Sequence, residues 1–147
     1  MEQSVEAMSA VPARMNEAWN RGDAAAFFSD FAHDAEFVDF EGTLHKGRAE
    51  MIAFHQPVFD TVLKGSRLVG GEVPFARIVQ PGWGVVHHRV SLLMPGEEEP
   101  LPSRRSMQLL AVVRQNGRWE VAALQNARLV SLEAATTLDS LSAAECE

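Results

Sequence analysis

The spacing of hydrophobic positions changes along the chain. Near the N-terminus they recur every three or four residues, as on one face of a helix, at Val5, Met8, Val11, Met15 and Trp19. After residue 66 they recur every second residue, as in half-buried strands. The chain therefore opens with helices and continues with strands.

The first helix has two alternative starts. Ser4 can cap a helix that Pro12 then breaks, or the helix begins near Ser9 and Pro12 lies in its first turn, where proline is tolerated. Gly22 suits the left-handed position that ends a helix, and Asp23 can cap the next one. Two helices with a tight connection are the expected result.

Shorter elements follow. The pattern predicts a helix over residues 24–31 with three phenylalanines facing the core, a strand over 36–40, a turn at 41–43, a short strand over 44–46 and a helix from 47 to 65. Pro57 is expected to kink that last helix or to mark a weak point in it.

The second half of the sequence is expected to form a sheet. Strands are predicted over 67–79 (one strand or two), 83–94, 103–114 and 118–129, with the Asn116–Gly117 pair typical of a tight hairpin turn. Residues 131–147 have a weak apolar face and are predicted to form a frayed tail. Helices before long antiparallel strands indicate one α+β domain over residues 1–147, a curved antiparallel sheet closed by about three helices into a cone around a ligand cavity.

Composition narrows the class of protein. The chain has 147 residues, 46% of them hydrophobic, and 20 acidic against 13 basic residues give a net charge of −7. This balance argues against binding to nucleic acid or to an anionic membrane surface. Cys146 is the single cysteine, so no intrachain disulfide is possible. No secretory leader or apolar span is evident, and we expect a cytoplasmic protein.

Asp39 is the best candidate for chemistry because it lies in an apolar segment between Val38 and Phe40. If it is buried, its pKa should be raised and it could transfer protons. The alternative is an aspartate at a strand end that binds nearby turn amides. His55, in the apolar stripe of the predicted third helix, is either its acid–base partner or a core residue.

Other candidates are polar or aromatic positions within apolar elements. Strand alternation places His88 inward, as a candidate ligand contact, and His87 outward. Gln108 and Gln125 are expected to line the cavity, and Asn126 to make a structural hydrogen bond. The five histidines show no metal-ligand spacing, so neither a metal nor another cofactor is expected.

Several of these segments together resemble a known superfamily. They are the stretches 19–23, 34–39, 47–48, 54–55 and 119–128, and their order resembles nuclear transport factor 2-like proteins, which include ketosteroid isomerases and SnoaL-like cyclases. Within it, the chain looks most like the SgcJ/EcaC family of enediyne antibiotic biosynthesis. The resemblance implies a dimeric cone-shaped barrel, with His55 facing the cavity near Asp39 and with Trp19 and Phe54 as ligand contacts.

The resemblance to ketosteroid isomerases has a limit. Asp39 falls where those enzymes carry their base, Gln108 near their protonated acid and Met15 at their oxyanion tyrosine, but this chain has no tyrosine. Steroid isomerase activity is therefore rejected. What the resemblance implies is acid/base chemistry on an apolar, polyketide-type intermediate, or non-catalytic binding of one. A dimer that docks a pathway enzyme is the third possibility.

Overall fold

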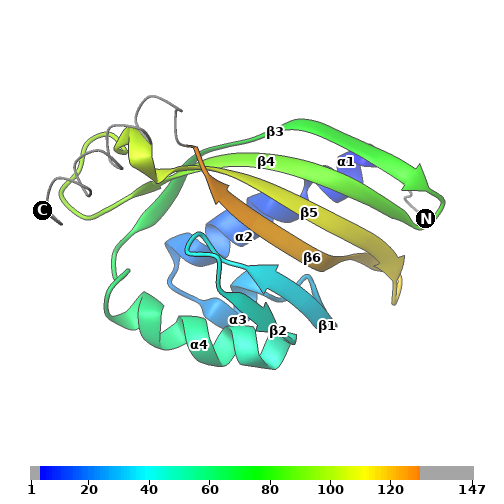
Figure 1. Ribbon diagram of the computed structural model, residues 1–147, viewed down its shortest axis with the longest axis horizontal. Helices are drawn as coiled ribbons and strands as arrows, with labels where there is room; N and C mark the ends of the chain where they lie inside the picture. The colour runs from blue at the N-terminus through cyan, green and yellow to red at the C-terminus, as the bar shows by residue number, and fades with distance from the viewer. Residues whose placement is uncertain (1–3, 130–147) are drawn as a thin grey trace, which may run out of the picture.

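A computed structural model describes residues 4–129, which form one curled sheet and the helices inside its curve (Figure 1). The helices are α1 (Val5–Ser9), α2 (Val11–Asn20), α3 (Ala24–Phe27), α4 (Arg48–Asp60) and a 3-10 helix, η1 (Pro102–Arg104). The strands are β1 (Phe31–Val38), β2 (Leu44–Lys46), β3 (Arg67–Gln80), β4 (Trp83–Leu93), β5 (Arg105–Gln115) and β6 (Arg118–Arg128).

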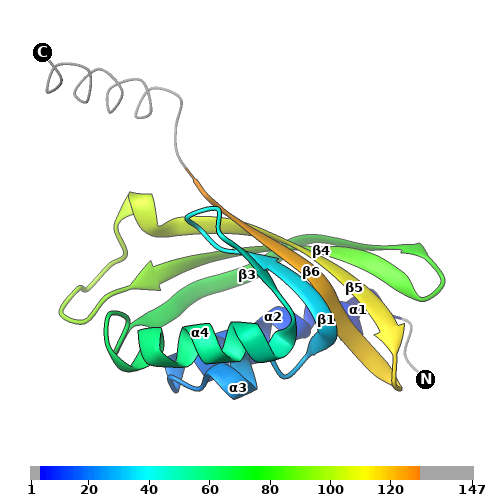
Figure 2. The ribbon, with the colours of Figure 1, turned by 60° about the horizontal axis from the view of Figure 1, so that its bottom comes forward.

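The six strands in this part of the chain follow the order β2-β1-β6-β5-β4-β3. All neighbours are antiparallel except β1 and β6, which run parallel, so the predicted α+β class is confirmed but the sheet is mixed. The long strands bend around α2, while α4 lies below β1 and β2 (Figure 2). The sheet is curled but does not close on itself.

The N-terminal helices combine both predicted starts. Ser4 caps α1 by accepting a hydrogen bond from the Ala7 amide at 3.0 Å, and Pro12 lies in the first turn of α2. The predicted stop is confirmed: Gly22 has a φ of 67° and the Asp23 carboxylate caps α3. Residue 10 separates the two helices and has helical dihedrals, which is why one periodic pattern runs through both.

The segment between residues 24 and 40 departs from the prediction. The helix ends at Phe27, and the strand begins at Phe31 rather than at residue 36. Phe31 pairs with Val121 of β6, a long-range contact that local spacing could not reveal. Phe27, Phe28 and Phe31 are nevertheless all in the core, as expected.

The strands of the second half lie close to their predicted positions. Residues 67–80 form one strand whose register shifts twice near Gly70–Gly71 and Pro74. The turn between β5 and β6 has positive φ at both Asn116 (54°) and Gly117 (76°), the geometry that suits tight hairpins. The predicted tail, 131–147, and Cys146 lie outside the described residues.

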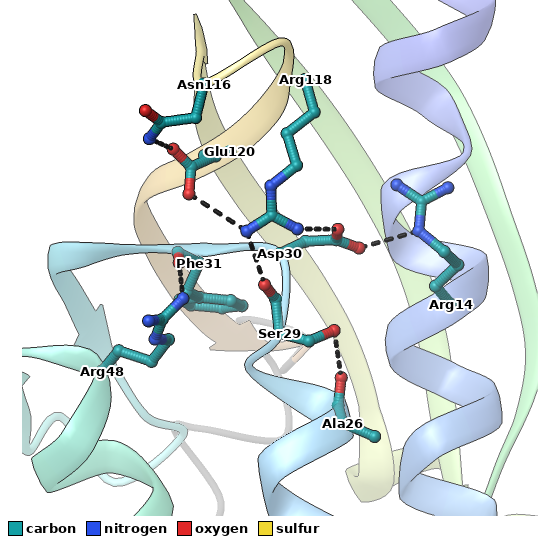
Figure 3. Close-up of polar contacts among 9 residues, drawn as sticks. All are labelled: Arg14, Ala26, Ser29, Asp30, Phe31, Arg48, Asn116, Arg118 and Glu120. Carbon is teal, nitrogen blue, oxygen red and sulfur yellow. Dashed lines mark hydrogen bonds and ion pairs between the residues drawn. The ribbon is translucent and has the colours of Figure 1, made fainter.

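A polar network joins α2, the connection between α3 and β1, and the start of β6 (Figure 3). Asp30, between α3 and β1, pairs with Arg14 of α2 at 2.8 Å and with Arg118 of β6 at 3.4 Å. Arg118 also donates to Glu120 at 3.3 Å. The Asp30 carboxylate therefore links α2 and β6 at the start of β1.

Candidate functional site

A cavity of about 500 Å³ lies between the concave face of the sheet and helices α2 and α4. Most of its wall is apolar: Trp19, Phe27, Phe37, Phe40, Phe54, Val58, Val62, Leu63, Leu68, Val90, Leu92 and Met94. Its polar lining is Asp39, Glu41, Thr43, His55, Arg104, Ser106, Gln108, Asn126 and Arg128. An apolar space with a few convergent polar groups is the usual form of a small-molecule site.

Asp39 follows β1 and lines the cavity with its hydrogen-bonding capacity largely used. Oδ1 accepts from the amides of Glu41 (2.9 Å) and Thr43 (3.0 Å), and Oδ2 lies 3.0 Å from Nε2 of His45. Burial alone raises the pKa of Asp39, but these hydrogen bonds, with that from His45 the strongest, outweigh it and lower the pKa. The expectation of a raised pKa was wrong, and the turn-binding alternative describes Asp39.

His45 is the residue that the sequence reasoning missed. It is 3% exposed, whereas Leu44 is 49% exposed, so the short strand β2 points the histidine inward beside Phe37. The tight turn after β1 folds β2 back and brings the imidazole to Asp39. Alternation within β2 was the available signal, because it sets His45 on the face opposite to both of its neighbours.

His55 lines the cavity from α4 and is 7% exposed. Its Nδ1 donates to the carbonyl of Met51 at 2.7 Å, which leaves Nε2 as the lone-pair nitrogen, with no hydrogen-bond partner among residues 4–129. The rings of Phe28 and Phe54 lie 4.9 and 5.1 Å away, centroid to centroid. Burial lowers the pKa of His55, so the neutral imidazole is favoured.

The structure brings Asp39, His45 and His55 into one group. The two imidazole centroids are 5.4 Å apart, and His45 in turn contacts the Asp39 carboxylate. The sequence prediction that Asp39 and His55 share one cavity agrees with this geometry, but His45 stands between them. A direct hydrogen bond between Asp39 and His55 does not occur.

His88 is buried inward, as strand alternation predicted, but it does not line the cavity. Its Nδ1 donates to Gln108 Oε1 at 2.8 Å, and its Nε2 accepts from Asn16 Nδ2 at 3.2 Å. Gly71 permits this approach, since a Cβ there would lie 2.5 Å from the Asn16 nitrogen. The predicted ligand contact is therefore corrected to a structural role: His88 fixes the amide of Gln108.

Gln108 lines the cavity as predicted, whereas Gln125 does not. Ala111 pairs with Ala123 but Val112 pairs with Val121, so one extra residue bulges from β6. The bulge reverses the alternation beyond it. Gln125 is exposed on the outer face, and Asn126 lines the cavity with an Oδ1 that has no hydrogen-bond partner.

Trp19 and Phe54 both line the cavity, from α2 and α4. Trp19 donates its indole N–H to Ser66 at 3.0 Å and packs on Phe59 at 4.8 Å, so it is also a core anchor. Phe54 is 48% exposed and lies 4.6 Å from the His45 ring. Trp19 is thus held firmly, whereas Phe54 forms an open part of the wall.

Two arginines line the cavity from η1 and from the end of β6. Arg104 pairs with Glu97. Arg128 donates to the carbonyl of Ser103 at 2.8 Å, and its guanidinium lies 4.2 Å from the Phe40 ring centroid. This end of the cavity is the polar one.

Neither a metal site nor a membrane span is found in the part of the chain that the structure describes. No three His, Cys, Asp or Glu side chains among residues 4–129 are grouped so that they could hold a metal ion. None of the helices in that range is both long and apolar enough to cross a membrane.

Several solved structures share this fold. A domain of unknown function with a cystatin-like fold from Nostoc punctiforme has 38% sequence identity and a TM-score of 0.89, over 97% of this chain and 88% of that one. A ketosteroid isomerase-like protein from Erwinia carotovora atroseptica has 15% identity and a TM-score of 0.71, over 89% and 100% of the two chains. An NTF-2 like protein of unknown function from Shewanella oneidensis has 17% identity and a TM-score of 0.66, over 80% and 93%.

The sequence comparisons agree with the fold. No match was found among curated proteins. A family model described as a SnoaL-like domain matches residues 13–122, most of the chain, including His45, His55 and Gln108. The chain belongs to the SnoaL-like domain family.

Proposed function

We propose that this protein is a cofactor-independent acid/base catalyst that moves a proton on an apolar small molecule held in the cavity. The observation that carries the proposal is the neutral His55, which lines the apolar cavity and whose Nε2 has no hydrogen-bond partner among residues 4–129, while Nδ1 is held by the Met51 carbonyl. A general base needs a free lone pair within hydrogen-bond reach of the proton it removes. His55 meets the first condition better than Asp39, whose oxygens already accept three hydrogen bonds.

Asp39 then acts through its charge. Ionised and fixed by its turn amides, it holds His45 in place, and its negative charge favours the protonated form of His55. His45 lies between them and, when charged, disfavours the protonated form of His55, which keeps His55 neutral and able to accept a proton. The pair Asp39 and His55 is kept as the catalytic assignment, with the base moved from the carboxylate to the imidazole.

Gln108 supplies a hydrogen-bond donor to the cavity that His55 also lines. Because its Oε1 accepts from His88, its Nε2 amide is the group left to bind a ligand oxygen. One amide donor polarises a carbonyl less than the paired donors of a full oxyanion hole. We therefore expect proton abstraction beside a carbonyl that is already activated, as in a conjugated or polyketide-derived ketone.

The biological setting is the most specific part of the proposal. The SnoaL-like family and a ketosteroid isomerase-like neighbour support a small-molecule pocket suited to binding or acid/base chemistry. The motif resemblance to the SgcJ/EcaC family favours an intermediate of enediyne biosynthesis as the ligand. Cytoplasmic location follows as part of the same proposal.

A binding protein without turnover is the second candidate. It is favoured by the saturated hydrogen bonds of Asp39 and by the dominance of apolar side chains in the cavity wall. In that function the cavity holds an unstable apolar intermediate away from water. Filling the cavity with a larger side chain would then matter more than any change at His55.

We also propose a homodimer formed through the outer face of the sheet. Phe75, His87, Leu109 and Gln125 form one cross-strand row there, and Phe75 and Leu109 are 54% and 43% exposed. Exposed apolar side chains in one row across a sheet favour protein association, here with His87 between Phe75 and Leu109. Sedimentation of the protein and of Leu109→Lys tests this: we expect a dimer that the lysine dissociates. A wild-type monomer would contradict it, and a pathway enzyme would then be the better partner for this face.

The catalytic proposal is tested by proton exchange on a neutral probe. In D₂O, NMR would follow deuterium entering the α-positions of 2-naphthylacetone with protein, with His55→Gln, and with His33→Gln as a matched control on an exposed histidine. We expect the protein and His33→Gln to exceed the buffer rate and His55→Gln to fall to it. Probe binding without accelerated exchange would leave the binding function as the better account.

A further inference from the structure

The polar end of the cavity carries one positive charge without a paired negative charge. Arg104 forms an ion pair with Glu97. Arg128 lines the same cavity, but no carboxylate among residues 4–129 lies within ion-pair distance of it. Glu41 attracts Arg128 without reaching it. A charged group half-buried without a partner normally costs stability, so its presence calls for a reason.

The geometry of Arg128 prepares it for a ligand. Its Nη1 donates to the Ser103 carbonyl at 2.8 Å, and the Phe40 ring packs on the guanidinium at 4.2 Å. These two contacts hold the guanidinium in place and use one of its five N–H donors. A fixed planar guanidinium is the side chain best suited to bind a carboxylate through two parallel hydrogen bonds.

The surrounding charges select a ligand with a single negative charge. Glu97 already pairs with Arg104, and Glu41 lies near Arg128, so a second negative charge on the ligand would find no unpaired cation and would meet Glu41. Burial and then the nearby Arg104 lower the pKa of Arg128 from its usual value, the effect expected where two guanidiniums share a partly desolvated site. A bound carboxylate offsets both effects, because its negative charge pairs with Arg128 in the partly desolvated site.

We propose that the cavity binds an apolar carboxylic acid whose carboxylate docks on Arg128, with its apolar body extending toward Trp19 and His55. The inference rests on the proposed function, since it names the substrate class for the same cavity. It adds that Arg128, at the polar end of the cavity, selects substrates by their charge and takes no part in moving the proton.

The test compares two probes of nearly the same shape, 2-naphthoate and the neutral 2-naphthamide, by titration of the full chain. Arg128→Gln removes the unpaired positive charge from the polar end of the cavity. Arg105→Gln removes the same charge from an exposed neighbouring position and serves as the matched control. We expect wild type and Arg105→Gln to bind naphthoate about tenfold or more tightly than naphthamide. Arg128→Gln should lose this preference while its affinity for naphthamide is unchanged.

Three outcomes would overturn the inference: equal binding of the two probes by wild type, binding of neither, or the same loss in both variants. Circular dichroism of the variants excludes unfolding as the cause, and Arg128→Lys should restore part of the preference through charge alone. The readout is independent of catalysis. Failure of 2-naphthylacetone exchange with a retained naphthoate preference would overturn the catalyst and not this site, and the reverse pattern would overturn only this site.

Discussion

His55 and His88 are equally deep in the protein, yet their surroundings differ. They are 7% and 2% exposed, and burial lowers the pKa of both. Both ring nitrogens of His88 are engaged, by Asn16 and Gln108, whereas only Nδ1 of His55 is. Burial therefore does not separate a structural histidine from a reactive one; the free nitrogen and the cavity beside it do.

The surroundings of His88 and those of His55 contribute differently to the concave face of the sheet. Around His88, helix α2 and strands β4 and β5 are locked by a chain of side-chain hydrogen bonds. Around His55, aromatic rings surround the imidazole, and the cavity lies on its open side. The rigid region orients Gln108 toward the cavity, so the structural histidine still contributes to the site, through the amide it holds.

The largest expected effect is on chemistry at His55. Replacing it with phenylalanine should lower the rate of proton exchange on 2-naphthylacetone by roughly 10²- to 10⁴-fold, the usual contribution of a positioned base. The free energy of unfolding should change little, because an aromatic ring fits among Phe28, Phe37 and Phe59. Exchange kinetics measured beside urea denaturation check both parts. A folded variant with the full rate would remove His55 from the mechanism.

The next effect is on stability at His88. Its replacement by leucine leaves the amides of Asn16 and Gln108 without their partner and should lower the free energy of unfolding by about 2–4 kcal/mol. Urea denaturation measures the loss. Leucine at His33, an exposed histidine, should cost far less. Equal costs at the two positions would show that the hydrogen-bond chain contributes nothing.

The pH dependence of stability sharpens the comparison. Both histidines have a folded pKa below the unfolded value of 6.5, so the unfolded chain binds more protons between those values. The free energy of unfolding should therefore be flat above pH 6.5 and fall below it, by up to about 1.4 kcal/mol per pH unit for each histidine. Urea denaturation at several pH values checks this. His88→Leu and His55→Phe should each remove one histidine's contribution to the slope of the free energy of unfolding against pH. An unchanged slope in a variant would contradict the lowered pKa of that histidine.

The smallest effect is expected at Asp39. Asparagine there keeps the shape of the turn but weakens the contact with His45, and should cost about 1 kcal/mol of stability at pH 7. Since the pKa of Asp39 lies below 3.8, wild type keeps this contribution above that pH and loses it as the pH falls through the folded pKa. The exchange rate should drop less than at His55, and a larger drop would restore Asp39 as the base.

The sequence was informative wherever local spacing decides the structure. Strand alternation placed His88 inward, and the Asn116–Gly117 pair predicted the hairpin. It was wrong about Gln125 and Asn126, because the bulge in β6 reverses alternation and depends on pairing with β5. It also missed His45, whose importance comes from the turn that returns it to Asp39. Local spacing predicts which face of a strand a residue occupies, whereas bulges and turns decide which residues come into contact.

The measurement that tests the central claim most directly is imidazole ¹⁵N NMR of the two histidines at pH 7, with and without 2-naphthoate. We expect both rings to be neutral with the proton on Nδ1, and the ligand to shift the Nε2 resonance of His55 while His88 stays in place. A His55 ring protonated on Nε2, or a ligand that shifts His88 and not His55, would contradict the account.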